Sequence, residues 1–489
     1  MTGSKRRGRL CRRKDENENM RKIFCFACLA SLMLPAVCWG ADFPTASTED
    51  VVALVEKGGG VLVDARHPDI FNGWALNGLP RGGHIEGATD FAYTFLTCGY
   101  DEKGNLEKKT RDEVLSETLA RKGLTPGKKV IVYDTDGKDA LLVAEYLRSR
   151  GIEDVSLYDA KPWIEDGNRK LVSWPAYELL VPAEIVKRIT EGNVPEGFTS
   201  AREIKVFDIN WGDEEGSGYL KGHVPTAVHI NTDSIEPPQV FDDKRRRWVS
   251  EEESDSVKKL WKLPDDATLL KLLLDNGITA DTCVICTGPE PMAAARFAVV
   301  CRYMGVKDVR LMNMGLEGWR LAGYALATDS VKPAPASAFG ERASESRAWI
   351  DSIDEVAKKL GTEGFTLVDN RTREEFLGKT SGYSYHNIAG RIEGAVYGCA
   401  GELSSSSMYY YRNIDKSMRN GDEILALWKD LGIDTGNHIS FMCGSGWRVS
   451  EILWYARVMG LNNTSIYSDG WIAWSDEGRP FVTGDPASK

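Results

Sequence analysis

The chain repeats one unit of strands and helices three times. Each unit opens with an amphipathic helical pattern, continues with an apolar strand that ends in aspartate, and turns through a Gly-rich segment into another strand. The openings lie at residues 48–55, 182–189 and 352–360. Strands that alternate with helices form parallel sheets covered on both faces. The sequence therefore predicts an α/β protein of three tandem domains, each a parallel sheet with helices on both faces.

The length and the period of the repeat favour whole domains over a solenoid. A chain of 489 residues is too long for one hydrophobic core. The units recur about every 145–165 residues, whereas solenoid repeats span roughly 20–50 residues. We predict domains at residues 41–178, 179–335 and 345–489, with a Pro/Ala-rich linker before the third.

The first 40 residues have the pattern of an N-terminal extension followed by a signal peptide. Arg21 and Lys22 precede an apolar stretch at 23–37, and small residues, Gly40 among them, lie near its end. This order predicts export and cleavage after Gly40, with the start codon open between Met1 and Met20. No later apolar run approaches the about 18 residues of a membrane span, so we expect no membrane contact after cleavage.

The remaining chain is acidic. Cleavage would remove nine of 61 Lys/Arg and three of 72 Asp/Glu, which leaves a net charge near −17. Such a charge opposes binding to nucleic acid and anionic lipid. An anionic small substrate would therefore need local positive charge at its site.

Cys443 is the candidate nucleophile. It ends an apolar run, and a helical pattern over residues 449–459 begins shortly after it. Between them lies a short loop of Gly444, Ser445, Gly446, Trp447 and Arg448. This order places the thiol among free backbone N–H groups at the positive end of a helix dipole. We expect a thiol there to lose its proton easily, and the thiolate is the nucleophilic form.

The other cysteines have simpler explanations. A structural role at a strand end is the alternative for any free cysteine, Cys443 included. Cys283 and Cys286 lie three apart in a strand-like run, face opposite sides, and are about 10 Å apart, beyond disulfide reach. Cys399 follows a strand after the Gly-rich turn and is either a small packing residue or a second sulfur acceptor. The spacing of cysteine and histidine predicts no metal site, and no cofactor is indicated.

These residues resemble the rhodanese family of sulfurtransferases, and in the third unit the exported three-domain members of Gram-negative bacteria. The resemblance rests on the Asp-x-Arg strand end, the Gly-His-Ile-x-Gly-Ala turn, the cysteine loop and a closing Gly-Trp. It implies a periplasmic enzyme in which Cys443 takes a sulfane sulfur as a persulfide. The implied donor is a small anion such as thiosulfate, with 3-mercaptopyruvate open, and the implied acceptor is cyanide or a thiol.

The resemblance also locates the substrate site and the inactive units. Residues 444–448 would bind the transferred sulfur, with Arg448 either pairing with the anionic donor or only capping the loop. Asp134 occupies the nucleophile position of the first unit, and Gly288 that of the second. We therefore expect both units to be inactive scaffolds that wall the cleft of the third, with Cys286 as a less favoured second nucleophile.

The identity of the donor and two other functions of the cysteine loop have to be considered. Glu375 stands where two-domain relatives carry an arginine that binds the donor, which puts the donor in question. A cysteine phosphatase needs five residues between Cys and Arg, whereas four separate Cys443 from Arg448, which argues against phosphate. A sulfur carrier that stores sulfur on Cys443 for a partner protein, without turnover, remains the alternative to an enzyme.

Overall fold

The computed structural model describes residues 42–198, 203–236, 262–384 and 386–486, together with the backbone of residues 239–242 and 247–250. The predicted signal peptide, its cleavage site and the two possible start codons lie outside the described residues. None of the helices in the described part of the chain is long and apolar enough to cross a membrane.

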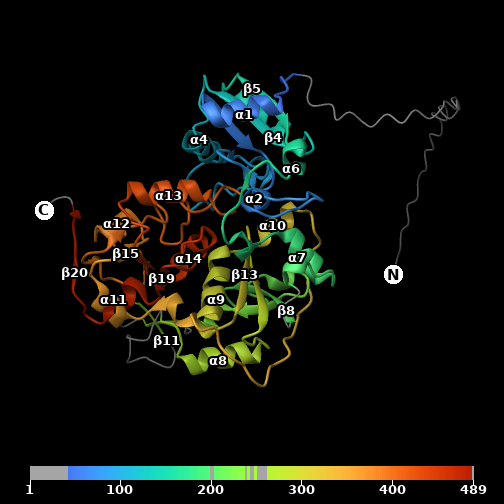
Figure 1. Ribbon diagram of the computed structural model, residues 1–489. Helices are drawn as coiled ribbons and strands as arrows, with labels where there is room; N and C mark the ends of the chain where they lie inside the picture. Colours follow the sequence, from blue (N-terminus) through green and yellow to red (C-terminus); the bar gives the residue numbers. More distant parts are fainter. Residues whose placement is uncertain are drawn as a thin grey trace, which may run out of the picture. The chain divides into compact units, whose positions relative to one another are not determined.

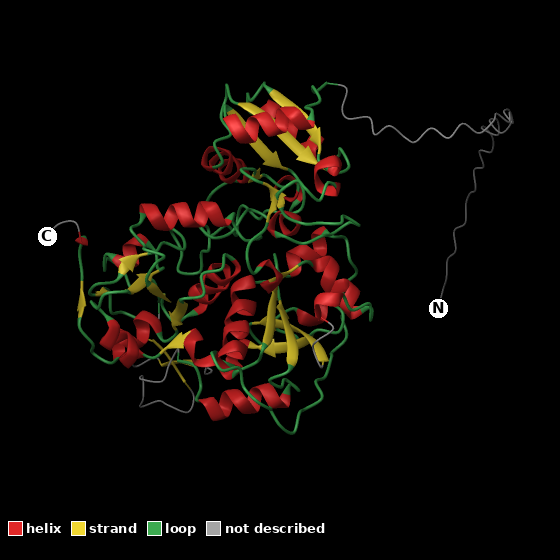
Figure 2. Cartoon of the chain, viewed as in Figure 1, coloured by secondary structure: helices red, strands yellow, loops and turns green. Residues whose placement is uncertain are grey.

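Three parallel sheets occupy successive stretches of the chain, as the repeat predicts. Their strand orders are β3-β1-β4-β5, β7-β13-β12-β8-β9 and β14-β19-β18-β15-β17, and every pairing in them is parallel. Strands and helices alternate along the colour gradient of Figure 1, and helices flank the sheets in Figure 2. The predicted fold class is confirmed.

The first repeat contains the sheet strands, one short antiparallel pair and six helices among its described residues. The strands are β1 (Gly60–Asp64), β3 (Thr89–Asp90), β4 (Lys129–Asp134) and β5 (Val155–Asp159), with the pair β2 (His84–Ile85) and β6 (Leu171–Val172). The helices are α1 (Thr48–Lys57), α2 (Pro68–Asn72), α3 (Thr94–Thr97), α4 (Arg111–Arg121), α5 (Asp139–Ser149) and α6 (Lys161–Glu165).

The second repeat again alternates strands with helices, but its parallel sheet has a fifth strand. The strands are β7 (Leu180–Val181), β8 (Glu203–Asn210), β9 (Val228–Asn231), β12 (Thr282–Thr287) and β13 (Asp308–Met312), with the hairpin β10 (Gln239–Asp242) and β11 (Arg247–Ser250). The helices are α7 (Ala183–Thr190), α8 (Asp266–Asp275), α9 (Pro291–Met304) and α10 (Leu316–Leu321). Strand β8 extends past the expected end at Asp208 because Ile209 and Asn210 still pair with β9.

The third repeat carries the candidate nucleophile. Its strands are β14 (Ile350–Asp351), β15 (Phe365–Asp369), β17 (Val396–Tyr397), β18 (His438–Met442) and β19 (Thr464–Tyr467), with the pair β16 (Arg391–Ile392) and β20 (Phe481–Val482). The helices are α11 (Ile353–Lys359), α12 (Arg373–Phe376), α13 (Gly421–Asp430), α14 (Trp447–Val458) and α15 (Gly470–Asp476).

Alternating strand residues bury both faces of each sheet. In β4, Val130 and Val132 belong to one apolar cluster, whereas Ile131 and Tyr133 belong to another. Successive side chains of a strand point to opposite faces, so both clusters need helices to cover them. Because both faces of each sheet are buried, the strands appear in the sequence as continuous apolar runs.

The second and third repeats share one hydrophobic core. Residues of β12 and α9 belong to the same buried cluster as residues of β18 and α14. Trp454 of α14 is fully buried, and its indole N–H donates to the carbonyl of Leu179 at 3.0 Å. A shared core of this kind fixes two domains relative to each other more firmly than a polar interface would.

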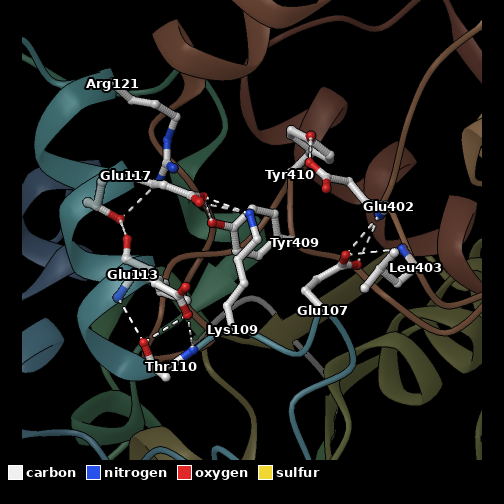
Figure 3. A network of polar contacts seen from close by, with 12 residues as sticks. Glu107, Lys109, Thr110, Glu113, Glu117, Arg121, Glu402, Leu403, Tyr409 and Tyr410 are labelled. Carbon is white, nitrogen blue, oxygen red and sulfur yellow. Dashed lines mark hydrogen bonds and ion pairs between the residues drawn. The ribbon is translucent and has the colours of Figure 1, made fainter.

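The first repeat holds the 402–410 segment of the third (Figure 3). Glu107 is 4% exposed, and its carboxylate accepts the N–H groups of Glu402 and Leu403 at 3.0–3.2 Å. Lys109 lies 4.5 Å from the ring centre of Tyr409, whose hydroxyl donates to Glu117. These contacts tie a loop without helix or strand to a carboxylate on another domain.

Replacement of Glu107 by glutamine should destabilise the protein. In glutamine one carboxylate oxygen is replaced by an NH2 group. That group would face a backbone N–H which the carboxylate oxygen now accepts, so a buried donor would lose its acceptor. We expect the free energy of unfolding to fall by about 1–3 kcal/mol, measured by thermal unfolding. Glu56→Gln, on an exposed position of α1, is the control. Equal melting temperatures for the two variants would contradict this role of Glu107.

Candidate active site

Cys443 lies at the carboxyl end of β18, directly before the loop that leads into α14. The side chain is 2% exposed. The carbonyl oxygen of Cys443 accepts the N–H of Trp471 at 2.8 Å, and that of Gly444 accepts the N–H of Ile472 at 3.1 Å. The closing Gly-Trp of the repeat therefore holds the outer edge of the cysteine loop.

The N–H groups of the cysteine loop are left for a ligand. Gly446 is the N-cap of α14, adopts a left-handed conformation with φ of 89°, and has no side chain to cap the helix. Within the described part of the chain, no backbone carbonyl accepts the N–H groups of residues 444–448. Helix α14 begins at Trp447, two residues earlier than predicted, because Gly446 completes the turn. Free N–H groups at a helix N-terminus bind anions.

Three glycines allow neighbouring groups to approach the loop. A side chain at Gly444 would collide with the hydroxyl of Tyr383, and one at Gly446 would collide with the guanidinium of Arg296. One at Gly470 would collide with the carbonyl of Gly444. The need for a tight turn alone does not account for glycine at these three positions. The close contacts with neighbouring groups give the better explanation.

A cavity of about 220 Å³ lies in front of Cys443. The third repeat lines it with Tyr383, Ser405, Ser406, Cys443, Ser445, Trp447 and Arg448, and the second with Trp211, Glu236 and Met292. The second repeat thus walls the site as predicted. The first contributes no described lining residue and instead holds the loop that carries Ser405 and Ser406.

Arg448 is balanced by an acid. It is 1% exposed, and its guanidinium donates to both oxygens of Glu375 at 3.3–3.4 Å and to the hydroxyl of Tyr383 at 2.9 Å. Burial raises the pKa of Glu375, but the charges of Arg448 and Arg371 outweigh it and bring the pKa below its ordinary value. Arg448 therefore lines the cavity with part of its positive charge compensated by Glu375. This ion pair gives a physical role to the glutamate that stands where two-domain relatives carry an arginine.

The second repeat supplies a further pair of charged groups, Arg296 and Glu236. Arg296 on α9 is 2% exposed and lies 5.8 Å from the ring centre of Trp447. In the described part of the chain its Nε and Nη1 have no hydrogen-bond partner. Burial lowers the pKa of Arg296, while Glu236, Cys443 and Asp469 act in the opposite direction. The sequence offered no motif for either residue, because both come from a domain without a nucleophile.

The corresponding loop of the first repeat already holds an anion. Asp134 ends β4 and is fully buried, and its two oxygens accept the N–H groups of Gly137 and Ala140 at 2.9 Å. A carboxylate therefore fills the place that an anionic substrate sulfur would take. Asp134, Asp136 and Asp139 also bring oxygens within 4.8 Å of one another. Since both Asp134 oxygens are engaged by the loop, the cluster is explained without an ion.

The second repeat cannot hold a side chain at the nucleophile position. A Cβ on Gly288 would collide with the carbonyl oxygen of Ile209. Cys286, two residues earlier, is fully buried in the sheet, and burial raises its pKa well above the ordinary value. Cys283 and Cys286 belong to clusters on opposite faces, as predicted from their spacing. Neither thiol reaches the cavity of Cys443.

Cys399 does not line the Cys443 cavity. It is 6% exposed and follows β17 with a positive φ of 47°. Burial raises its pKa to about 11, and Tyr397 only partly offsets that effect. The packing interpretation of Cys399 therefore fits the structure. Asp369 and Arg371 form a fully buried ion pair at 2.7 Å, and the guanidinium of Arg371 lies 4.7 Å from the ring centre of Trp471.

The chain matches the model of the rhodanese-like domain family three times, over residues 47–160, 187–322 and 352–477. Escherichia coli thiosulfate sulfurtransferase YnjE is 32% identical over 454 residues, which cover 91% of this chain and 94% of that protein. The Thermus thermophilus sulfur carrier protein TtuD is 27% identical over 290 residues, 58% of this chain and 92% of that protein.

Solved structures of EanB have the same fold. The wild-type EanB structure superposes with a TM-score of 0.79 at 28% identity and covers 91% of this chain and 99% of its own. Another EanB structure, with a TM-score of 0.78 and 28% identity over 90% of this chain and all of its own, contains a cysteine persulfide with ergothioneine. With three matched domains and a relative of nearly full length, the chain belongs to the rhodanese family and is a three-domain sulfurtransferase.

Proposed function

We propose that the protein transfers a sulfane sulfur from thiosulfate, or a similar small anion, to cyanide or a thiol through a persulfide on Cys443. The observation that carries the proposal is a thiol at an uncapped helix N-terminus, facing a cavity and surrounded by unused N–H groups. The Escherichia coli relative is a thiosulfate sulfurtransferase, which supports this donor.

Two displacements on sulfur complete the cycle. The Cys443 thiolate attacks the outer sulfur of thiosulfate, the sulfur–sulfur bond of the donor breaks, and sulfite leaves with the bonding electrons. The terminal sulfur of the persulfide is then anionic, and the N–H groups of residues 444–448 are placed to stabilise that charge. The acceptor attacks this terminal sulfur, and Cys443 leaves as the thiolate that began the cycle.

Isolated protein treated with thiosulfate should carry one extra sulfur on the peptide that contains Cys443. The expected gain is about 32 Da, removed by cyanide, and peptide mass spectrometry measures it. Cys443→Ser should neither gain the sulfur nor form thiocyanate, whereas Cys399→Ser should do both at the wild-type rate. A gain on Cys399 or Cys286 instead would contradict the proposal. Loading without repeated turnover would favour a sulfur carrier over an enzyme.

A second acceptor class has one structural observation in its favour. The rings of Trp211 and Trp447 lie 5.5 Å apart beside the cavity, and Trp211 is 42% exposed. Indole faces attract quaternary ammonium groups. A solved relative from Chlorobium limicola, an anaerobic ergothioneine biosynthesis enzyme, is described with trimethyl histidine as its natural substrate.

Loaded protein incubated with trimethyl histidine tests this acceptor. If trimethyl histidine accepts the sulfur, mass spectrometry detects ergothioneine. Trp211→Leu then lowers the ergothioneine yield several-fold, because the ammonium group loses its contact with the indole face. The rate with cyanide, which makes no such contact, is unchanged. Absence of ergothioneine with full thiocyanate formation would reject this acceptor and leave the transfer to cyanide or thiols intact.

Export to the periplasm is the remaining part of the proposal. It rests on the signal pattern before Gly40 and the acidic chain that follows it. Expressed in a Gram-negative host, the protein should be recovered from the periplasm beginning at Ala41, as read by N-terminal mass analysis. Recovery of uncleaved protein from the cytosol would reject export.

A further inference from the structure

Glu236 places an acid of the second repeat at the site of sulfur transfer. It follows the short helical turn η4 (Thr232–Ser234) and lines the same cavity as Cys443. Its Oε1 is shielded from solvent and has no hydrogen-bond partner among the residues that the structure describes, although the residue as a whole is only partly buried. A shielded carboxylate oxygen without a donor is costly unless it carries a proton or meets one during the reaction.

The surroundings of Glu236 favour a carboxyl group that changes its protonation state near neutral pH. Burial raises the pKa of Glu236 to about 7, while a hydrogen bond from Trp447 and the charge of Arg296 act against the rise and Asp233 adds to it. The third repeat adds Cys443, Tyr383 and the compensated Arg448 to the same cavity. An acid with a pKa near the working pH is suited to proton transfer.

The sulfur-transfer cycle contains a step that needs such an acid. After the donor leaves, the terminal sulfur of the persulfide is negatively charged, whereas the acceptor that must attack it is cyanide or a thiolate, also an anion. Repulsion between two charges at contact distance in a shielded site opposes the attack strongly. Protonation of the terminal sulfur removes that repulsion and leaves Cys443 to depart as the thiolate.

We propose that Glu236 protonates the terminal sulfur of the Cys443 persulfide and recovers the proton from the product; this role rests on the proposed function. The carboxyl proton passes to the terminal sulfur and leaves a carboxylate. Cyanide then attacks that sulfur, the bond to Cys443 breaks, and the electron pair stays on Cys443. The thiocyanic acid so formed returns its proton to Glu236 and leaves as thiocyanate, so that proton and charge balance over the cycle.

Glu236→Gln separates this role from loading of the cysteine. Loading by thiosulfate needs no proton from Glu236, so the variant should gain the sulfur normally by mass spectrometry. Discharge of the loaded protein by cyanide should slow at least about tenfold near pH 6. The ratio of wild-type to variant discharge rates cancels the ionisation of cyanide itself. That ratio should fall towards one as the pH rises through about 7 and the Glu236 carboxyl loses its proton.

Two further variants control for a structural effect. Glu236→Asp keeps a carboxyl group. The ratio of the discharge rates of Glu236→Asp and Glu236→Gln should therefore still fall as the pH rises, with its midpoint at a different pH from that of the wild type. Asp233→Asn, an exposed acid on the same turn, should change the discharge rate by less than about twofold. A discharge rate of Glu236→Gln that is equal to wild type, or lower by the same factor at every pH, would overturn the proton role. So would a folded Glu236→Gln protein that cannot be loaded. Failure of wild-type protein to load would reject the proposed function itself.

Discussion

The site depends on a helix N-terminus whose backbone N–H groups no side chain caps. In each repeat a central strand ends shortly before a helix begins, and a different group lies at each helix start. In the second repeat the side chain of Glu290 caps the helix by accepting the N–H of Met292 at 3.3 Å. Asp134 places a carboxylate on the N–H groups of the first loop, and Gly288 fits against the backbone of the second. In the third repeat Cys443 presents a thiol to its cavity, and no described residue of the first two repeats places a thiol there.

The other repeats present no nucleophile and contribute side chains and contacts to the site of the third. The second shares a core with the third and brings Trp211, Glu236 and Met292 to the cavity. The first ties down the loop that carries Ser405 and Ser406 through Glu107. Around the sulfur, Arg448 is compensated by Glu375, and Arg296 faces Glu236. The site therefore combines a fixed anion cradle with carboxylates that limit its net positive charge.

The features that depend on local sequence patterns could be predicted from the sequence. The repeat, the strand ends and the cysteine loop all follow from periodicity and short motifs. The loop also predicted a helix after Cys443, although Gly446 starts it two residues early. Glu236 and Arg296 could not be found in this way, because they reach Cys443 only through packing between domains. The pairing of Arg448 with Glu375 needed the structure too, since 73 residues separate them.

A crystal structure of the protein after treatment with thiosulfate would show where the transferred sulfur lies. We expect electron density for one additional sulfur on Cys443, directed into the loop and within hydrogen-bond distance of several N–H groups of residues 444–448. An added sulfur that turns away from those N–H groups, towards the solvent side of the cavity, would show that the helix N-terminus does not hold the transferred sulfur.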